Sequence, residues 1–236
     1  MVERAPEPDD ILWENADIPK SRQKRNIFLA YFFGILILLG GGVIQYYLQV
    51  FQNQITDATI KSYFSSASSL IITIFNGIII QFLIFVTNLE GRETKTDQDR
   101  SLLVKICLYS FFNAGIFYTA ANILAQSLHS FNIQGDISYE ITLFMSMNAI
   151  TPNVISLITN KIEFPALLFR FMARLGCCKY TQAEANKLYE LGEIDFPVKY
   201  AYVIRTVWLT CFYGPFVPVI VPISIFGLIF FYFTET

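Results

Sequence analysis

The 236-residue chain is too poor in charge for an ordinary soluble domain. Hydrophobic residues make up 54% of it and charged residues only 15%, whereas a soluble domain carries about 25% charged residues. The net charge of −2 provides no basic field to hold nucleic acid. The composition therefore argues against a soluble enzyme and against a nucleic-acid partner, and it predicts a protein embedded in lipid.

Five stretches without Asp, Glu, Lys or Arg predict the membrane helices. They are residues 26–56, 62–89, 106–135, 141–160 and 206–234. Each provides the roughly 20 residues that a helix needs to cross about 30 Å of hydrocarbon, and a helix satisfies its own backbone there. The first four stretches predict full spans at 27–51, 66–89, 106–126 and 141–160.

The fifth region, 200–233, is too long for one ordinary span. As a single helix it would measure about 50 Å, and Pro215, Pro218 and Pro222 interrupt its middle. A single kinked and steeply tilted span is the alternative, but tilt does not absorb so much excess length. We expect two short helices joined by a turn at Tyr213-Gly214-Pro215. The predicted fold class is all-α: a polytopic transmembrane bundle of about six membrane helices, with four full spans and a proline-broken hairpin.

The basic residues predict the orientation. A cytoplasmic N-terminus places every Lys and Arg except Lys61 on the cytoplasmic side, in keeping with the positive-inside rule. The predicted domains are a cytoplasmic N-terminal segment, 1–25, and a transmembrane pore-like domain, 26–236, with a cytoplasmic loop at 161–199. Residues 1–25 lack the apolar core of a cleaved signal peptide. We therefore expect an integral, multi-pass membrane protein.

Small and polar residues share one face of each of the first four spans, at a turn of 100° per residue. The four stripes contain Gly34, Gly41, Gln45, Gln49 and Gln52; Ser69, Thr73, Asn76 and Thr87; Gly115, Thr119, Asn122, Gln126 and His129; and Ser146, Ala149, Asn153, Ser156 and Asn160. Such stripes either join helices through hydrogen bonds worth about 0.6 kcal/mol each or line a hydrated pathway. The spacing alone leaves both explanations open.

Two single residues also carry alternatives. Pro152 removes one backbone hydrogen bond inside its helix and is either a gating hinge or a static kink. Glu90 ends the second span, where it would attract cations to a pore mouth or lie solvated in a loop. With one His, no metal-spaced Cys/His cluster and no glycine-rich phosphate loop, we expect no catalytic residue, no metal site and no cofactor.

Several motifs together resemble one family of channels. Residues 5–15 read APEPDDILWEN before a basic cluster and a span, and Leu89-Glu90-Gly91, Phe111-Phe112-Asn113, Tyr200-Ala201 and Tyr213-Gly214-Pro215 follow in order. These motifs are similar to those around the pore domain of the OSCA/CSC-like family. Its members are stretch- or osmolality-gated, calcium-permeable cation channels, distantly related in fold to the anoctamins.

The resemblance implies an ion pathway between the first five predicted membrane helices, with the helix at 141–160 as the gating helix. The pathway residues it favours are Gln45, Asn76, Glu90, Asn113, Asn122, Gln126, Asn153, Ser156 and Asn160, with Pro152 as the hinge. The function expected is the pore-domain module of a mechanically or osmotically gated, non-selective cation channel. The alternatives are a non-conducting accessory subunit of a larger membrane complex and, by analogy with anoctamins alone, a lipid scramblase.

The expected partners follow from the same comparison. Family members are longer than this chain, so we expect membrane lipid and other membrane-protein chains as partners, and a homodimer is compatible with the sequence. No nucleic acid is expected.

Overall fold

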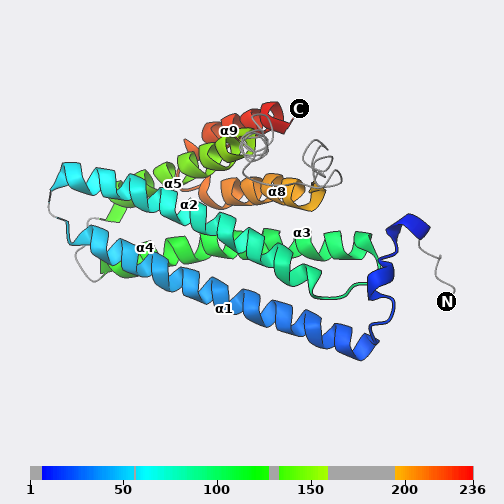
Figure 1. The fold of residues 1–236 in the computed structure, drawn as a ribbon. Coiled ribbons are helices and arrows are strands. Elements are labelled where there is room, and N and C mark those ends of the chain that lie inside the picture. Colours follow the sequence, from blue (N-terminus) through cyan, green and yellow to red (C-terminus); the bar gives the residue numbers. More distant parts are fainter. Residues whose placement is uncertain (1–6, 56, 128–132, 159–194, 236) are drawn as a thin grey trace, which may run out of the picture.

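The computed structural model describes residues 7–55, 57–127, 133–158 and 195–235 (Figure 1). Most of the predicted cytoplasmic loop and the pathway residue Asn160 lie outside the described residues. The side chain of Gln126 also lies outside them.

The described part of the chain is all-helical and contains no strand, as predicted. Two 3-10 turns, η1 (Pro8–Asp10) and η2 (Trp13–Asn15), precede the long helices. The helices are α1 (Lys20–Asn53), α2 (Ala58–Asn88), α3 (Lys95–Phe111), the π-helical segment η3 (Phe112–Phe117), α4 (Tyr118–Ser127), α5 (Ile133–Ser156), α8 (Phe196–Tyr213) and α9 (Ile220–Glu235). The segments α3, η3 and α4 follow one another without a break.

Three helices are long and apolar enough to cross a membrane. They are Lys20–Asn53, Thr59–Asn88 and Lys95–Ala125, and the shorter apolar helix Ile220–Glu235 accompanies them. These three correspond to the first three predicted spans. The first helix begins seven residues before position 27 because its basic cluster consists of good helix formers and continues the helix.

The proline-rich region forms a helical hairpin, which confirms the predicted break. α8 ends at Tyr213 and α9 begins at Ile220. Pro215 and Pro218 lie in the connecting turn, while Pro222 lies in the first turn of α9, where a missing N–H removes no helical bond.

The long helices run side by side, and α2 and α3 occupy the centre (Figure 1). α2 contacts α1, α3 and α5, while α3 packs against α8 and α5 packs against α9. One apolar cluster includes Tyr118, Phe144 and Leu209. A second, nearer the α2–α3 turn, includes Leu83 and Ile106.

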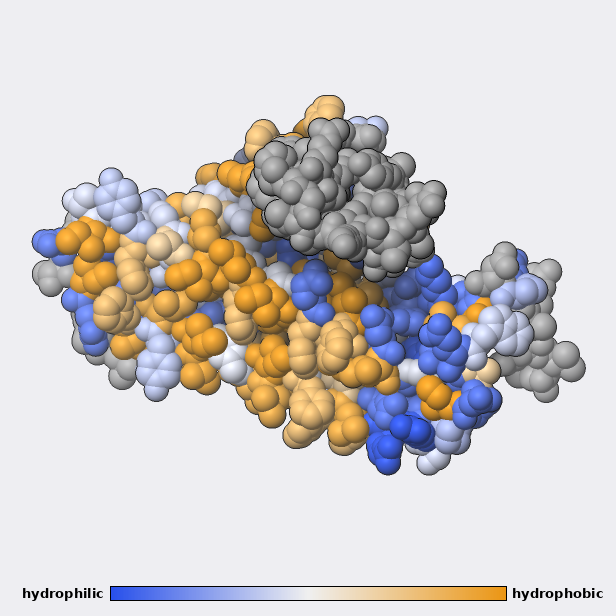
Figure 2. All heavy atoms as spheres, in the orientation of Figure 1, coloured by the Kyte–Doolittle hydropathy of each residue, from blue (hydrophilic) through white to orange (hydrophobic). Residues whose placement is uncertain are grey.

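α1 attaches to the bundle through the polar stripe predicted for it. Its buried residues are Ala30, Gly34, Leu38, Gly41, Gln45, Gln49 and Gln52. The other faces of the helix expose large apolar side chains such as Phe32, Leu36 and Leu39. In Figure 2 apolar atoms cover the middle of the rods, and hydrophilic side chains gather at the end that holds the N-terminal segment. This arrangement, with polar groups inside and apolar groups outside, suits a lipid environment.

Candidate functional site

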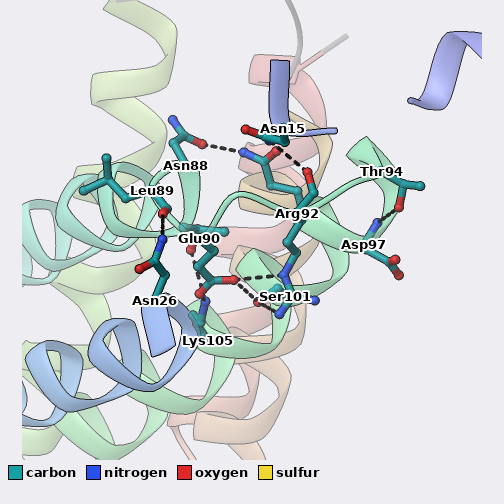
Figure 3. A network of polar contacts seen from close by, with 12 residues as sticks. Asn15, Asn26, Asn88, Leu89, Glu90, Arg92, Thr94, Asp97, Ser101 and Lys105 are labelled. Atoms are coloured by element: carbon teal, nitrogen blue, oxygen red, sulfur yellow. Dashed lines mark hydrogen bonds and ion pairs between the residues drawn. The ribbon is translucent and has the colours of Figure 1, made fainter. Parts of the chain in front are cut away.

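The turn between α2 and α3 carries a fully buried carboxylate, that of Glu90 (Figure 3). It pairs with Nζ of Lys105 and, at 2.9 Å, with Nε of Arg92. Ser101 Oγ donates a hydrogen bond to it at 3.2 Å, and Lys105 Nζ also donates to Thr87 Oγ1 at 3.4 Å. One acid therefore meets two cations, and the cluster presents no uncompensated negative charge.

Lys105 is 1% exposed, although the sequence pattern placed it in a cytoplasmic loop. The short connection between α2 and α3 lets a lysine three turns into α3 reach an acid at the end of α2. A buried charge is tolerated when a counter-charge and hydrogen bonds offset its desolvation. The ammonium also lies 5.1 Å from the centre of the Tyr31 ring, a cation–π contact.

The N-terminal segment clamps this turn. Nδ2 of Asn15 donates to the carbonyl of Arg92 at 2.8 Å, and the backbone N–H of Leu12 donates to the carbonyl of Glu93 at 2.9 Å. Asp10 accepts two hydrogen bonds at 2.9 Å, from the N–H and hydroxyl of Thr96 in the first turn of α3. These acidic and amide residues of segment 7–15 thus hold the loop that carries Glu90.

Gly91 has a positive φ of 68°, which favours glycine. A Cβ at this position would also meet Cδ1 of Ile18 at 2.5 Å. Nδ2 of Asn26, in α1, donates to the carbonyl of Leu89 at 3.1 Å. The turn therefore fits between the N-terminal segment and α1 only with a glycine after Glu90.

Three buried amides form a chain across three helices in the middle of the bundle. Nε2 of Gln45 donates to Oδ1 of Asn113 at 3.0 Å, and Nδ2 of Asn113 donates to Oδ1 of Asn76 at 2.6 Å. Oε1 of Gln45 and Nδ2 of Asn76 have no partner among the described residues. We call Gln45, Asn113 and Asn76 the amide chain. The amide chain joins α1, η3 and α2. Among the described residues, its Gln45 end keeps an unbonded acceptor and its Asn76 end keeps an unbonded donor.

The π-helical segment Phe112–Phe117 positions the middle amide. Backbone carbonyls of this segment also accept hydrogen bonds from side chains outside it. The hydroxyl of Tyr213, at the end of α8, lies 2.8 Å from the carbonyl of Ala114 and 3.0 Å from that of Gly115. Thr119 Oγ1 donates to the carbonyl of Gly115 at 2.7 Å. Such π segments often occur at functional sites.

More buried polar groups lie toward the α1–α2 connection. Nε2 of Gln52 donates to Oε1 of Glu140 at 2.6 Å, and the hydroxyl of Tyr118 donates to the carbonyl of Glu140 at 3.2 Å. Asn122 is 1% exposed, and neither atom of its amide has a partner within the described ranges. Ser68 Oγ is also buried without a partner there. Buried polar groups in this state commonly bind ordered water.

These groups occupy successive levels along the bundle. At 1.5 Å per residue, Glu90 and Asn76 are about 20 Å apart along α2, and Gln45 and Gln52 are about 10 Å apart along α1. Because α1 and α2 are antiparallel, these levels are spread over about 30 Å, which is the thickness of the hydrocarbon layer. The apolar cluster that includes Leu83 and Ile106 separates the Glu90 level from the amide chain. We call this series, which consists of Glu90, the amide chain, Asn122 and the Gln52–Glu140 pair, the polar column.

The predicted hinge region on α5 is bound to α9. Pro152 lies inside α5, and the adjacent Asn153 is fully buried. Nδ2 of Asn153 donates to the carbonyl of Ala149 at 2.7 Å and to that of Gly227 at 2.9 Å. A Cβ on Gly227 would lie 2.8 Å from Cβ of Ala149, so α5 and α9 cross here in close contact.

The structure brings together only some of the predicted pathway residues. Gln45, Asn76 and Asn113 meet in the amide chain, Glu90 lies at the α2–α3 turn, Asn122 lies on α4, and Asn153 and Ser156 lie on α5. Ser156 Oγ donates to Glu235 at 2.6 Å. Asn122 shares the polar column with the amide chain, whereas Asn153 and Ser156 contact α9.

The sequence reasoning missed three contributors to the site. Lys105 was expected in a loop. The short connection between Glu90 and the following helix was a signal for its pairing with Glu90. Tyr213 was read only as part of a turn, and the pairing of Gln52 with Glu140 had no signal in either segment alone.

No protein-family model matches this chain, and no curated protein sequence matches it significantly.

Proposed function

We propose that the chain is the pore-domain module of a gated cation channel, and that the structure represents a closed conformation of its pathway. The observation that carries the proposal is the polar column. A hydrated route needs neutral oxygens that replace part of an ion's water shell, and the column contains them at several levels inside an apolar exterior.

The amide chain is the proposed gate. Its hydrogen bonds are between neutral groups, and each contributes about 1 kcal/mol net. Water that enters the bundle replaces such bonds at small cost, because the amide oxygens and nitrogens bond equally well to water. Separation of α1 from η3 and α2 would therefore open the column at this level first.

The finer parts of the proposal rest on the motifs that resemble the OSCA/CSC-like family. They support gating by membrane stretch or osmolality, permeability to calcium, and a multi-pass arrangement of four full spans plus the proline hairpin. The distribution of basic residues supports a cytoplasmic N-terminus. In this proposal Pro152 and Asn153 form the region about which α5 moves.

The test is a recording from liposome patches that contain the purified chain. Under suction, the wild type is expected to pass cation current, and Asn113→Leu is expected to change the unitary conductance. The matched control is Ile78→Leu on α2, since Ile78 is exposed and lies away from the column. Absence of current from a fully helical preparation would refute conduction by the chain alone.

One observation favours the second candidate, a non-conducting accessory subunit. Gln45, Asn113 and Asn76 bond to one another, and Glu90 is neutralised by cations, as expected of groups that only hold helices together. Co-purification with other membrane chains in a fixed ratio, together with silent patches, would establish this candidate instead.

A further inference from the structure

Arg205 is a buried cation that has no ionic partner in the part of the chain that the structure describes. It lies in the middle of α8 and is 3% exposed. No carboxylate forms an ion pair with it among the residues that the structure describes. Its guanidinium carbon lies 5.3 Å from the centre of the Tyr202 ring.

Most of its hydrogen-bonding capacity is unused. A guanidinium has five N–H donors. Nη2 of Arg205 donates to Oδ1 of Asn148, on α5, at 3.2 Å, and Nε has no partner within the described chain. Asn148 is itself 2% exposed, and its amide nitrogen is a second donor beside the guanidinium.

Lys105, which is also a buried cation, shows what Arg205 lacks. Lys105 has a carboxylate, a threonine hydroxyl and a tyrosine ring around its ammonium. Among the described residues, Arg205 has a neutral amide, a ring and, within electrostatic range, the thiol of Cys107. An arginine stays charged, and a buried charge that meets no opposite charge is strongly destabilising. In a membrane bundle such a residue is expected to have a counter-ion.

We propose that Arg205 and Asn148 bind a small monovalent inorganic anion between α5 and α8, with chloride as the representative. One positive charge calls for one negative charge, and the burial of both residues favours a small ion. The bound anion supplies the acceptor that Nε lacks. This inference goes beyond the proposed function and does not depend on conduction.

The test is thermal unfolding of the purified chain in a neutral detergent, with chloride exchanged for gluconate at constant ionic strength. Gluconate is too large for the site. The wild type is expected to show a saturable rise in Tm of about 2–4 °C as chloride replaces gluconate. Equal Tm values in the two salts would overturn the proposal.

Two variants make the test specific. Asn148→Asp places a carboxylate beside the guanidinium, so the chloride response should vanish while the protein remains at least as stable in gluconate. Arg205→Gln should also lose the response. The matched control is Asn122→Ser, a change of a buried amide on α4 that adds no charge, and it should retain the response.

The remaining outcomes decide against the proposal. Retention of the chloride response in Asn148→Asp would place the effect elsewhere, even if Arg205→Gln fails to fold. A rise in Tm caused by phosphatidylglycerol in gluconate, with no effect of chloride, would identify a lipid phosphate as the ligand instead.

Discussion

The Glu90 cluster and the amide chain are both buried, yet they differ in how completely their groups are satisfied. At the α2–α3 turn, Glu90 faces Lys105 and Arg92, so its negative charge is compensated. In the amide chain, Gln45 and Asn76 each keep a polar atom that has no partner among the residues described.

The difference indicates which region can move. Removal of one partner from a buried ion pair costs about 3–5 kcal/mol, whereas a neutral hydrogen bond contributes about 1 kcal/mol. The Glu90 cluster therefore holds the adjoining ends of α2 and α3 in place. The amide chain can exchange its hydrogen bonds with water. The following predictions test this contrast.

The largest effect is expected from Lys105→Met. The substitution keeps an apolar stem of similar length but leaves Glu90 without its lysine partner. We expect a loss of about 3 kcal/mol in the free energy of unfolding, the lower end of the range for a broken buried ion pair, because Arg92 still pairs with Glu90. The measurement is a denaturant titration of the helical circular dichroism signal in mixed micelles.

The matched control for that experiment is the double variant Lys105→Met with Glu90→Gln. Because both charges are then absent, much of the stability should return. Equal stability of the single and double variants would show that the ion pair does not lock the turn.

An intermediate effect is expected from Gly41→Ala. The added Cβ would meet the Phe75 ring at 2.7 Å and Oδ1 of Asn113 at 2.9 Å, so α1 would be forced away from the amide chain. We expect a loss of about 1–3 kcal/mol, measured by the same titration.

Gly40→Ala is the control for this change, since nothing lies within 4 Å of a Cβ at Gly40. It should leave stability unchanged or raise it through higher helix propensity. Equal free energies of unfolding for the Gly40→Ala and Gly41→Ala variants would show that the close approach of α1 at Gly41 does not hold the amide chain together.

A smaller effect is expected from Tyr213→Phe. The substitution removes the hydroxyl that contacts the carbonyls of Ala114 and Gly115 and retains the ring. We expect a loss of about 1 kcal/mol, the net contribution of one hydrogen bond, because Thr119 Oγ1 still donates to the carbonyl of Gly115. Amide hydrogen exchange should rise in residues 112–117 and stay constant in α9; an unchanged rate in the π segment would contradict this role.

Much of the fold could be predicted from the sequence because charge and periodicity act locally. The charge-free stretches located α1, α2 and the α3–α4 rod, the prolines located the break before α9, and the 100° spacing placed Gln45 and Asn76 on buried faces. Partners on different helices could not be predicted, because helical periodicity gives the face of a residue and not its level against a neighbour.

Three features illustrate that limit. The contact between Gln52 and Glu140 depends on how far α5 is shifted along α1. The carbonyls of the π segment bond to the hydroxyl of Tyr213, which lies about 100 residues later in the sequence. The stripe that contains Asn153 faces α9, so its side chain bonds to the backbone of that helix, a contact that the spacing on α5 alone could not predict.

The central claim is that the amide chain is the closed gate of the polar column. It is tested by the reactivity of Asn113→Cys, in a background with the native cysteines replaced by serine, toward a membrane-impermeant thiol reagent in liposomes. Because Asn113 is fully buried, the thiol should be unreactive at rest and react when the liposomes are swollen osmotically. A thiol that stays unreactive while the same swollen liposomes pass cation current would contradict the account.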